Sequence, residues 1–214
     1  MNNSNANIDD IIKEAIKSSF EILKELKNKG SSKKTRLIIP QSGDHKLCRV
    51  SEQELRFVFI EQIAPDLEKN GLYYSIETPT EKHYRFSSKT DKHLPPERDK
   101  GRCANFDLTI SDGNSLLAIV EFKSKSAESH SYAKDLCKLW NPGEGEKQDK
   151  NIIRYFISVF ETMDEDTKES FVGKIKSNGY IQKKEGDKDV FIVGKSLTEG
   201  QEDYEIECIK DSEL

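Results

Sequence analysis

The segment 105–125 constrains the fold more than any other part of this chain of 214 residues. Its first half alternates between polar and apolar residues, and the apolar positions are Phe106, Leu108 and Ile110. Such alternation predicts a strand with one buried face. An Asp-Gly pair at 112–113 predicts a hairpin turn. The half that follows is apolar on both faces, which is typical of a central strand covered by helices.

Two charged residues close this second strand, and strand geometry decides where they point. Glu121 and Lys123 are two residues apart and therefore share one face. Asp107, in the first strand, joins that face only if the hairpin loop holds an odd number of residues. We expect a three-residue loop over 112–114, with its glycine in the left-handed region. Asp107 would then lie opposite Ile119 and diagonal to Glu121, with backbones roughly 7–8 Å apart.

These two acids and the lysine, spaced as Asp-x13-Glu-x-Lys, resemble the motif of the PD-(D/E)xK (restriction-endonuclease-like) nuclease superfamily. The resemblance covers roughly residues 50–160. It implies that Asp107 and Glu121 bind a metal ion and that Lys123 is the catalytic lysine. The residue before the aspartate is often proline in the superfamily, and here it is Phe106.

The chemistry that the resemblance implies requires these residue types. Carboxylates hold a hard divalent cation, so Mg2+ or Mn2+ is the expected cofactor. The cation polarises the scissile phosphate and lowers the pKa of the attacking water. The lysine orients that water or stabilises the developing charge. The structural alternative is a solvated strand end at Glu121 and Lys123, with Asp107 as an exposed polar residue.

A helix that begins after Ser51 precedes the hairpin and carries two further candidates. The resemblance implies that Glu54 reaches the metal from this helix as a third acid. Ser51-x-x-Glu54 is equally a capping box, in which the glutamate bonds back to the serine backbone. Both roles stay open for Glu54. Arg56 is either a phosphate contact or a partner in a surface salt bridge.

Candidate nucleic-acid contacts lie on both sides of the hairpin. Residues 81–102 carry seven Lys/Arg against four Asp/Glu and lead directly toward Asp107. Arg102 is the best candidate there, because its planar guanidinium suits phosphate oxygens. Lys125, two residues past Lys123, is the next. Lys134, on the helix expected after the hairpin, is either a substrate contact or an exposed helix residue.

The remaining elements indicate an α/β fold. Residues 8–29 predict an N-terminal amphipathic helix that packs on the core or serves in dimerisation. A helix over 128–140 leads to an apolar strand over 152–161, which favours a right-handed crossover to a parallel neighbour. We expect a restriction-endonuclease-like core in which helices flank a mixed sheet of four or more strands. Residues 1–50 would form the helix and lead-in strands, and 51–214 the nuclease core with a C-terminal α/β extension, as one compact domain.

Composition narrows the setting of this fold. No apolar run approaches the ~18 residues of a membrane span, and no secretory signal opens the chain. The four cysteines lie far apart, which argues against a zinc site or disulfide scaffold and favours a reducing cytoplasm. The net charge of −5 argues against indiscriminate binding to nucleic acid.

The sequence therefore predicts a cytoplasmic, metal-dependent nuclease that hydrolyses phosphodiester bonds. DNA is expected rather than RNA, because the superfamily mostly cuts DNA. The alternative is a non-catalytic module on the same fold that binds nucleic acid or another protein. A homodimer is compatible with either reading, and a membrane partner is not expected.

Overall fold

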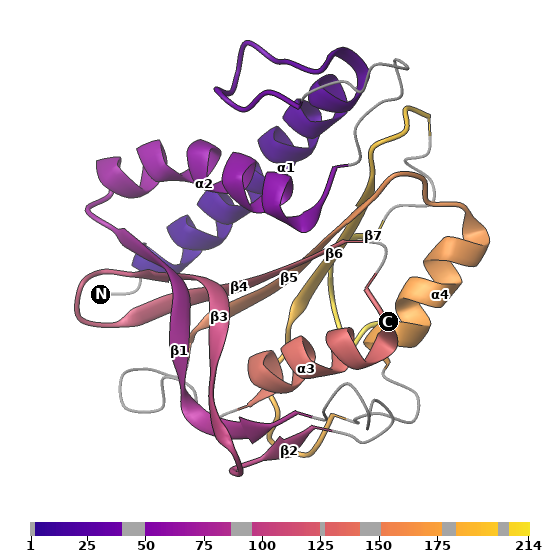
Figure 1. Ribbon diagram of the computed structural model, residues 1–214. Helices are drawn as coiled ribbons and strands as arrows, with labels where there is room; N and C mark the ends of the chain where they lie inside the picture. Colours follow the sequence, from indigo (N-terminus) through magenta and orange to yellow (C-terminus); the bar gives the residue numbers. More distant parts are fainter. Residues whose placement is uncertain are drawn as a thin grey trace.

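The computed structural model describes residues 3–39, 50–86, 96–124, 127–141, 151–176, 183–200 and 206–214. Within these ranges, seven strands form one mixed sheet with helices on both of its faces (Figure 1). The expected α/β class, with helices around a mixed sheet of four or more strands, is confirmed. Among the described helices, none is both long and apolar enough to cross a membrane.

The strands of the sheet are β1 (Tyr73–Arg85), β2 (Glu97–Arg98), β3 (Arg102–Ser111), β4 (Leu116–Ser124), β5 (Ile153–Phe160), β6 (Phe191–Ser196) and β7 (Ile206–Lys210). Their order across the sheet is β2-β1-β3-β4-β5-β6-β7. The pairs β4–β5 and β5–β6 are parallel, and the other neighbours are antiparallel. The expected parallel pairing across the crossover after the hairpin is therefore confirmed.

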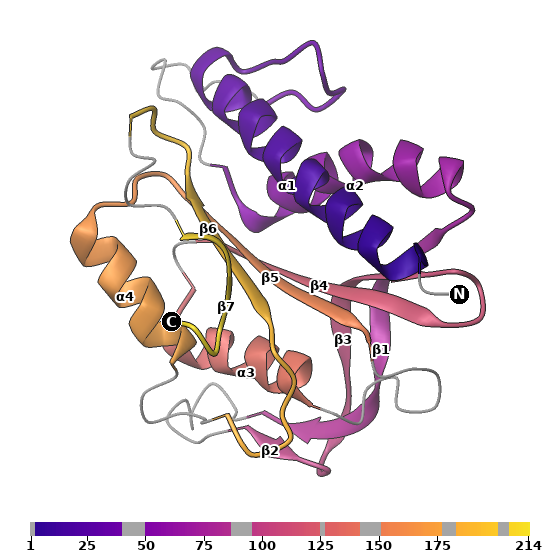
Figure 2. The same ribbon diagram turned by 180° about the vertical axis from the view of Figure 1, so that it is seen from behind.

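The helices form one layer on each side of the sheet (Figures 1 and 2). They are α1 (Asn3–Lys29), α2 (Glu52–Lys69), α3 (Ser129–Trp140) and α4 (Glu165–Ile175). The core on the α1 and α2 side takes Val120 and Phe122 from β4, and the core on the α3 and α4 side takes Ile119. This split follows from strand geometry, because successive side chains point to opposite faces. The N-terminal amphipathic helix is confirmed, and it packs on the first of these cores.

The hairpin between β3 and β4 differs from the expected three-residue loop. Four residues separate the strands, because the Asp112 carboxylate accepts hydrogen bonds from Asn114 N–H at 2.9 Å and Ser115 N–H at 2.7 Å. Gly113 has the expected positive φ, at 91°. The prediction of three loop residues over 112–114 was therefore wrong.

A β-bulge corrects the consequence of this longer loop. Ser111 pairs with Leu116, which by itself would turn Asp107 away from Glu121. The register shifts by one residue at the bulge, so that Thr109 pairs with Ile119. Continued past its last pair, Leu108–Val120, this register would bring Asp107 opposite Glu121. Ile119 pairs with Thr109, so the predicted partner of Asp107 was wrong.

β1 and β3 continue together beyond the part of β3 that pairs with β4. The β3–β4 register ends at Leu108–Val120, whereas β1 stays paired with β3 as far as Tyr84–Arg102. Figure 1 shows the result as an arm of β1, β3 and β2 that runs below β4 and past α3. Gly101, with a φ of 85°, closes this arm, because a Cβ there would lie 2.3 Å from the Tyr84 carbonyl oxygen.

Candidate active site

Asp107 lies at the point where β3 separates from β4. Its Oδ2 accepts a hydrogen bond of 2.8 Å from the backbone N–H of Phe122, so the carboxylate fills the place of a ladder bond. Phe122 stands between Glu121 and Lys123 in the sequence. The first acid of the predicted motif, Asp107, is thus hydrogen-bonded to the backbone between its second acid and its lysine.

Glu121 is buried beside a lysine that was not predicted from the sequence. Its side chain is only 1% exposed, and its Oε1 lies 2.6 Å from Nζ of Lys138 on α3. Burial raises the pKa of Glu121 well above its usual value; Lys138 opposes this shift, and the nearby Asp135 and Asp107 add to it. Glu121 is therefore an acid in a place where negative charge is costly.

Lys123 points to the same side of the sheet as Glu121 and meets two acids. Its Nζ lies 2.6 Å from Asp135 Oδ2 on α3 and 3.7 Å from Glu52 Oε2 on α2. Burial favours the neutral amine, but these acids outweigh it, so the pKa of Lys123 is raised above its ordinary value. The two acids therefore favour the charged form of Lys123.

Lys138 connects three elements around the same point. Its ammonium lies 2.6 Å from Glu121 on β4 and 2.9 Å from Asp135 on α3, and it donates a hydrogen bond of 2.8 Å to the Asn105 carbonyl of β3. Burial alone would raise the pKa of Asp135, yet the two lysines lower it. The four side chains of Glu121, Lys123, Asp135 and Lys138 therefore form one buried network, called the β4–α3 network below.

Half of this network was not predicted from the sequence. Asp135 and Lys138 lie one helical turn apart and flank the apolar stripe of α3. Their position next to the apolar stripe is the sequence signal that could have indicated side chains facing the sheet. In the structure both are buried, as is nearly all of α3 around them. What they meet on the sheet depends on the crossover and was not readable from the helix alone.

The helical acid that contacts the network is Glu52, not the predicted Glu54. Glu54 Oε2 accepts a hydrogen bond of 2.8 Å from Ser51 N–H and contacts the Ser51 hydroxyl, so the capping box is formed. Glu52, the first residue of α2, instead faces Lys123. Burial raises the pKa of Glu52, Lys123 opposes the shift, and Asp107 adds to it.

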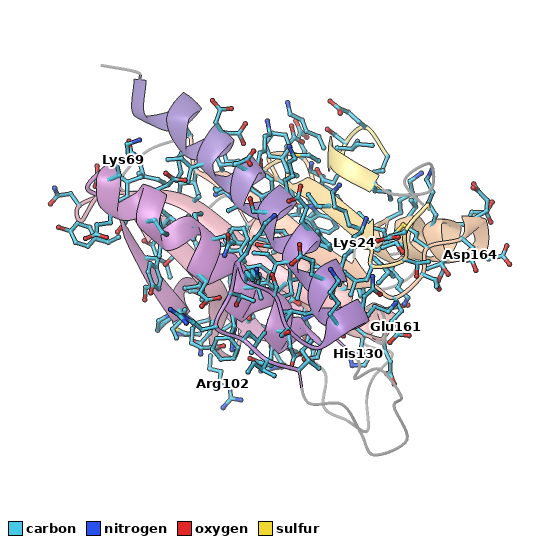
Figure 3. All side chains as sticks on the ribbon, turned by 90° about the horizontal axis from the view of Figure 1, so that it is seen from above. Lys24, Lys69, Arg102, His130, Glu161 and Asp164 are labelled. Atoms are coloured by element: carbon cyan, nitrogen blue, oxygen red, sulfur yellow. The ribbon has the colours of Figure 1, made fainter. Side chains whose placement is uncertain are left out.

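The predicted nucleic-acid contacts lie in different surroundings. Arg56 is 2.6 Å from Glu77 and 3.7 Å from Asp107 Oδ1, so it is a salt-bridge partner at the edge of the site. Arg102 is exposed and projects outward from the edge of the molecule (Figure 3). Lys125 lies outside the described residues.

A groove of about 720 Å3 opens beside the β4–α3 network, between α3 and the arm of β1 and β3. Asp135 and Lys138 belong to its lining, together with Arg102 and Lys134. The network is therefore accessible from a basic groove on one side, although its own charges are mostly buried.

The donor types at the site suit a hard divalent cation. Carboxylates are the oxygen ligands that Mg2+ prefers, and Asp107, Glu121 and Glu52 supply three. Burial raises the pKa values of Glu52 and Glu121, and a bound cation would offset the cost of keeping these buried carboxylates ionised. In the described part of the chain, however, no three His, Cys, Asp or Glu residues are grouped in a way that could hold a metal ion. Glu121 would have to exchange Lys138 for the ion.

Comparisons of this chain with protein-family models, curated proteins and solved structures gave no match. A function for the chain therefore has to be inferred from its own side chains. Those that matter are contributed by α2, β3, β4 and α3.

Proposed function

We propose that this protein is a metal-dependent nuclease that hydrolyses phosphodiester bonds, with DNA rather than RNA as its substrate. The observation that carries the proposal is the hydrogen bond from Phe122 N–H to Asp107, which joins the predicted acid to the Glu121–Lys123 segment. The element order also supports it, because α2, β1, the β3–β4 hairpin, α3 and β5 follow the helix–strand–hairpin–helix–strand order of the PD-(D/E)xK core.

Each residue of the site has a role in this proposal. Asp107, Glu121 and Glu52 would hold Mg2+ or Mn2+, so that Glu52 takes the position first expected for Glu54. When bound, the ion would polarise the scissile phosphate and lower the pKa of a coordinated water. Lys123 stabilises the negative charge that develops on the phosphate oxygens. Asp135 keeps Lys123 charged and oriented through its contact of 2.6 Å.

A second candidate is a non-catalytic module that binds nucleic acid or protein on the same fold. It is favoured by the closure of the β4–α3 network, where Lys138 already neutralises Glu121 at 2.6 Å and Asp135 at 2.9 Å. In this case the four charges serve to hold α3 on the sheet. The two candidates differ in one measurable property, which is metal-dependent hydrolysis.

The test is incubation of the protein with plasmid DNA, single-stranded DNA and RNA in Mg2+, Mn2+ or EDTA. We expect cutting that EDTA stops and that Asp107→Asn or Lys123→Ala lowers by about 100-fold or more, since each removes charge at the reacting phosphate. Asp66→Asn and Lys69→Ala are matched controls on the exposed surface of α2, with unchanged cutting. Circular dichroism and thermal melts confirm that each variant is folded. Binding without cutting under every condition would establish the non-catalytic module instead.

A further inference from the structure

The groove beside the β4–α3 network has one wall from the arm and one from α3. The arm contributes Tyr84 to Phe86 of β1 and Gly101 to Asn105 of β3, and α3 contributes Lys134, Asp135 and Lys138. Because the last two belong to the network, the groove borders it. A ligand that fills the groove therefore lies beside the β4–α3 network.

The rim of the groove is positively charged. Arg102 is exposed, and Arg85 is 62% exposed with its guanidinium 4.0 Å from Glu97. Lys134 faces them from α3 across the groove. Lysine and arginine on two facing walls are suited to a chain of phosphates that passes between them. The charge therefore favours a polyanion over a neutral ligand.

The inner wall is aromatic. Tyr84 and Phe86 stack with ring centroids 5.7 Å apart and planes 5° from parallel, and Tyr84 is buried. Phe86 is half-buried, and the ammonium of Lys134 lies 5.6 Å from its ring centroid. A cation over a half-buried ring is a weak contact, and a lysine chain can leave it for a phosphate. Phe86 then offers a fixed ring face to an incoming flat group.

Charge, aromatic wall and size together indicate the form of the ligand. Pockets of roughly 300–1,000 Å3 accept ligands of the size of one or two nucleotides. Bases stack on aromatic side chains when they are unpaired, whereas a duplex keeps its base faces covered. The groove, at about 720 Å3, thus fits a short unpaired segment. The bases of a continuous duplex could not stack on its aromatic wall, because their faces are covered.

We propose that this groove binds an unpaired nucleotide segment next to the scissile phosphate, with a base stacked on Phe86 and phosphates held by Arg102 and Lys134. Single-stranded nucleic acid is therefore the substrate class. This inference rests on the proposed nuclease function for the reaction, and it adds the strand form of the substrate. Single-stranded DNA and RNA share the chemistry that the groove recognises.

The test measures binding in EDTA, so that no cleavage occurs. Fluorescence anisotropy is recorded with labelled 12-mers as single-stranded DNA, as RNA of the same sequence and as blunt DNA duplex. We expect the single strands to bind about tenfold or more tightly than the duplex, and the DNA and RNA arms to identify the preferred sugar. Equal or tighter binding of the duplex would overturn the proposal.

Variants then locate the binding to the groove. Phe86→Leu keeps an apolar side chain but lacks a ring face, and we expect it to weaken single-strand binding about tenfold. Phe86→Trp keeps a ring face and should bind single strands like the unmodified protein. Arg102→Ala should weaken binding and lower the slope of log affinity against log salt by about one. Unchanged affinity in Phe86→Leu would overturn the proposal.

Two surface variants serve as matched controls. Lys69→Ala removes a cation at the far end of α2, well separated from Arg102 in Figure 3, and Tyr73→Ala removes an exposed aromatic ring from β1. Both should bind single strands like the unmodified protein. A loss in Lys69→Ala as large as that in Arg102→Ala would indicate nonspecific charge and overturn the assignment to the groove.

The same experiments separate this proposal from the nuclease proposal. Tight, Phe86-dependent binding without hydrolysis in Mg2+ or Mn2+ would support the proposed binding groove and refute the nuclease proposal. Hydrolysis that prefers duplex and is unchanged in Phe86→Leu would support the nuclease proposal and refute the proposed binding groove.

Discussion

Two groups of buried charges in this protein are built differently. Arg98 on β2 meets Asp187 through two hydrogen bonds of 2.6 and 2.8 Å, and the Asp187 side chain is only 2% exposed. One cation here satisfies one anion with matched geometry. In the β4–α3 network, by contrast, Asp135 contacts two lysines and Lys138 contacts two acids. Two further acids, Glu52 on α2 and Asp107 on β3, lie beside the network.

The difference between these groups indicates their purposes. The Arg98–Asp187 pair connects residues 89 positions apart in the chain. Each charge is paired and hydrogen-bonded, as a structural salt bridge requires. In and beside the network, burial raises the pKa values of Glu121 and Glu52, which lowers stability and is typical of functional sites. If this comparison is correct, changes to the pair should act on stability, and changes to the network should act on activity.

The largest stability effect is expected from the pair. Arg98→Ala leaves the Asp187 carboxylate buried without its partner, and we expect a loss of about 3–5 kcal/mol in the free energy of unfolding. Arg98→Lys keeps the charge but not the planar fork, so its loss should be smaller. Urea denaturation of both variants measures the difference. A loss in Arg98→Ala below that of an ordinary surface substitution would refute the structural role.

The network is expected to respond in the opposite sense. Lys123→Met removes the proposed electrostatic catalyst and should lower hydrolysis about 100-fold. Its stability should fall by roughly 1 kcal/mol only, because Asp135 keeps Lys138 at 2.9 Å. Rates and urea midpoints measured on one preparation check the split. A large stability loss with normal rates would make the network structural like the pair.

Metal binding should stabilise the protein through the candidate active site alone. At ten times the dissociation constant, Mg2+ or Mn2+ would add about 1.4 kcal/mol to the free energy of unfolding. Asp107→Asn should abolish the increase, whereas Arg98→Lys should keep it. Thermal melts with and without the ion give this readout without any substrate. Equal stabilisation of the Asp107→Asn protein would place the ion elsewhere.

The smallest effect is a pH dependence at Glu52. Its pKa is raised in the folded state, so the folded protein binds this proton more tightly than the unfolded chain does. Stability therefore falls as pH rises from the ordinary glutamate range through the folded pKa. Glu52→Gln lacks this dependence, and at neutral pH we expect it to be more stable by less than about 1 kcal/mol. Urea titrations at pH 4 and pH 7 test it, and a variant that is less stable at pH 7 would contradict the sign.

The sequence predicted the parts of the site that depend on local geometry. Glu121 and Lys123 share a face because they are two residues apart on a strand, and the structure places both toward α3. The capping box at Ser51 was recognisable because its residues lie within one turn. The same box decides that Glu54 is engaged at the helix start, which the sequence left open.

The parts that the sequence missed depend on long-range packing. Glu52 reaches Lys123 across 71 positions of the chain, and only the packing of α2 against β4 brings them to 3.7 Å. The role of Lys138 likewise depends on how α3 crosses back over the sheet. No periodicity within α2 or α3 contains that information, because a helix face can meet many different strand positions.

The sequence by itself determined the hairpin, the central strand and the shared face of Glu121 and Lys123, because alternation and turn chemistry act over a few residues. Only the tertiary structure decided that Asp107 accepts a hydrogen bond from Phe122 N–H, between those two residues. The loop has four residues, and a bulge at Leu117 shifts the register by one. The pairing of distant elements also decided which acids and lysines surround the motif. Such pairing depends on the packing of whole helices on the sheet, to which every residue of the two cores contributes.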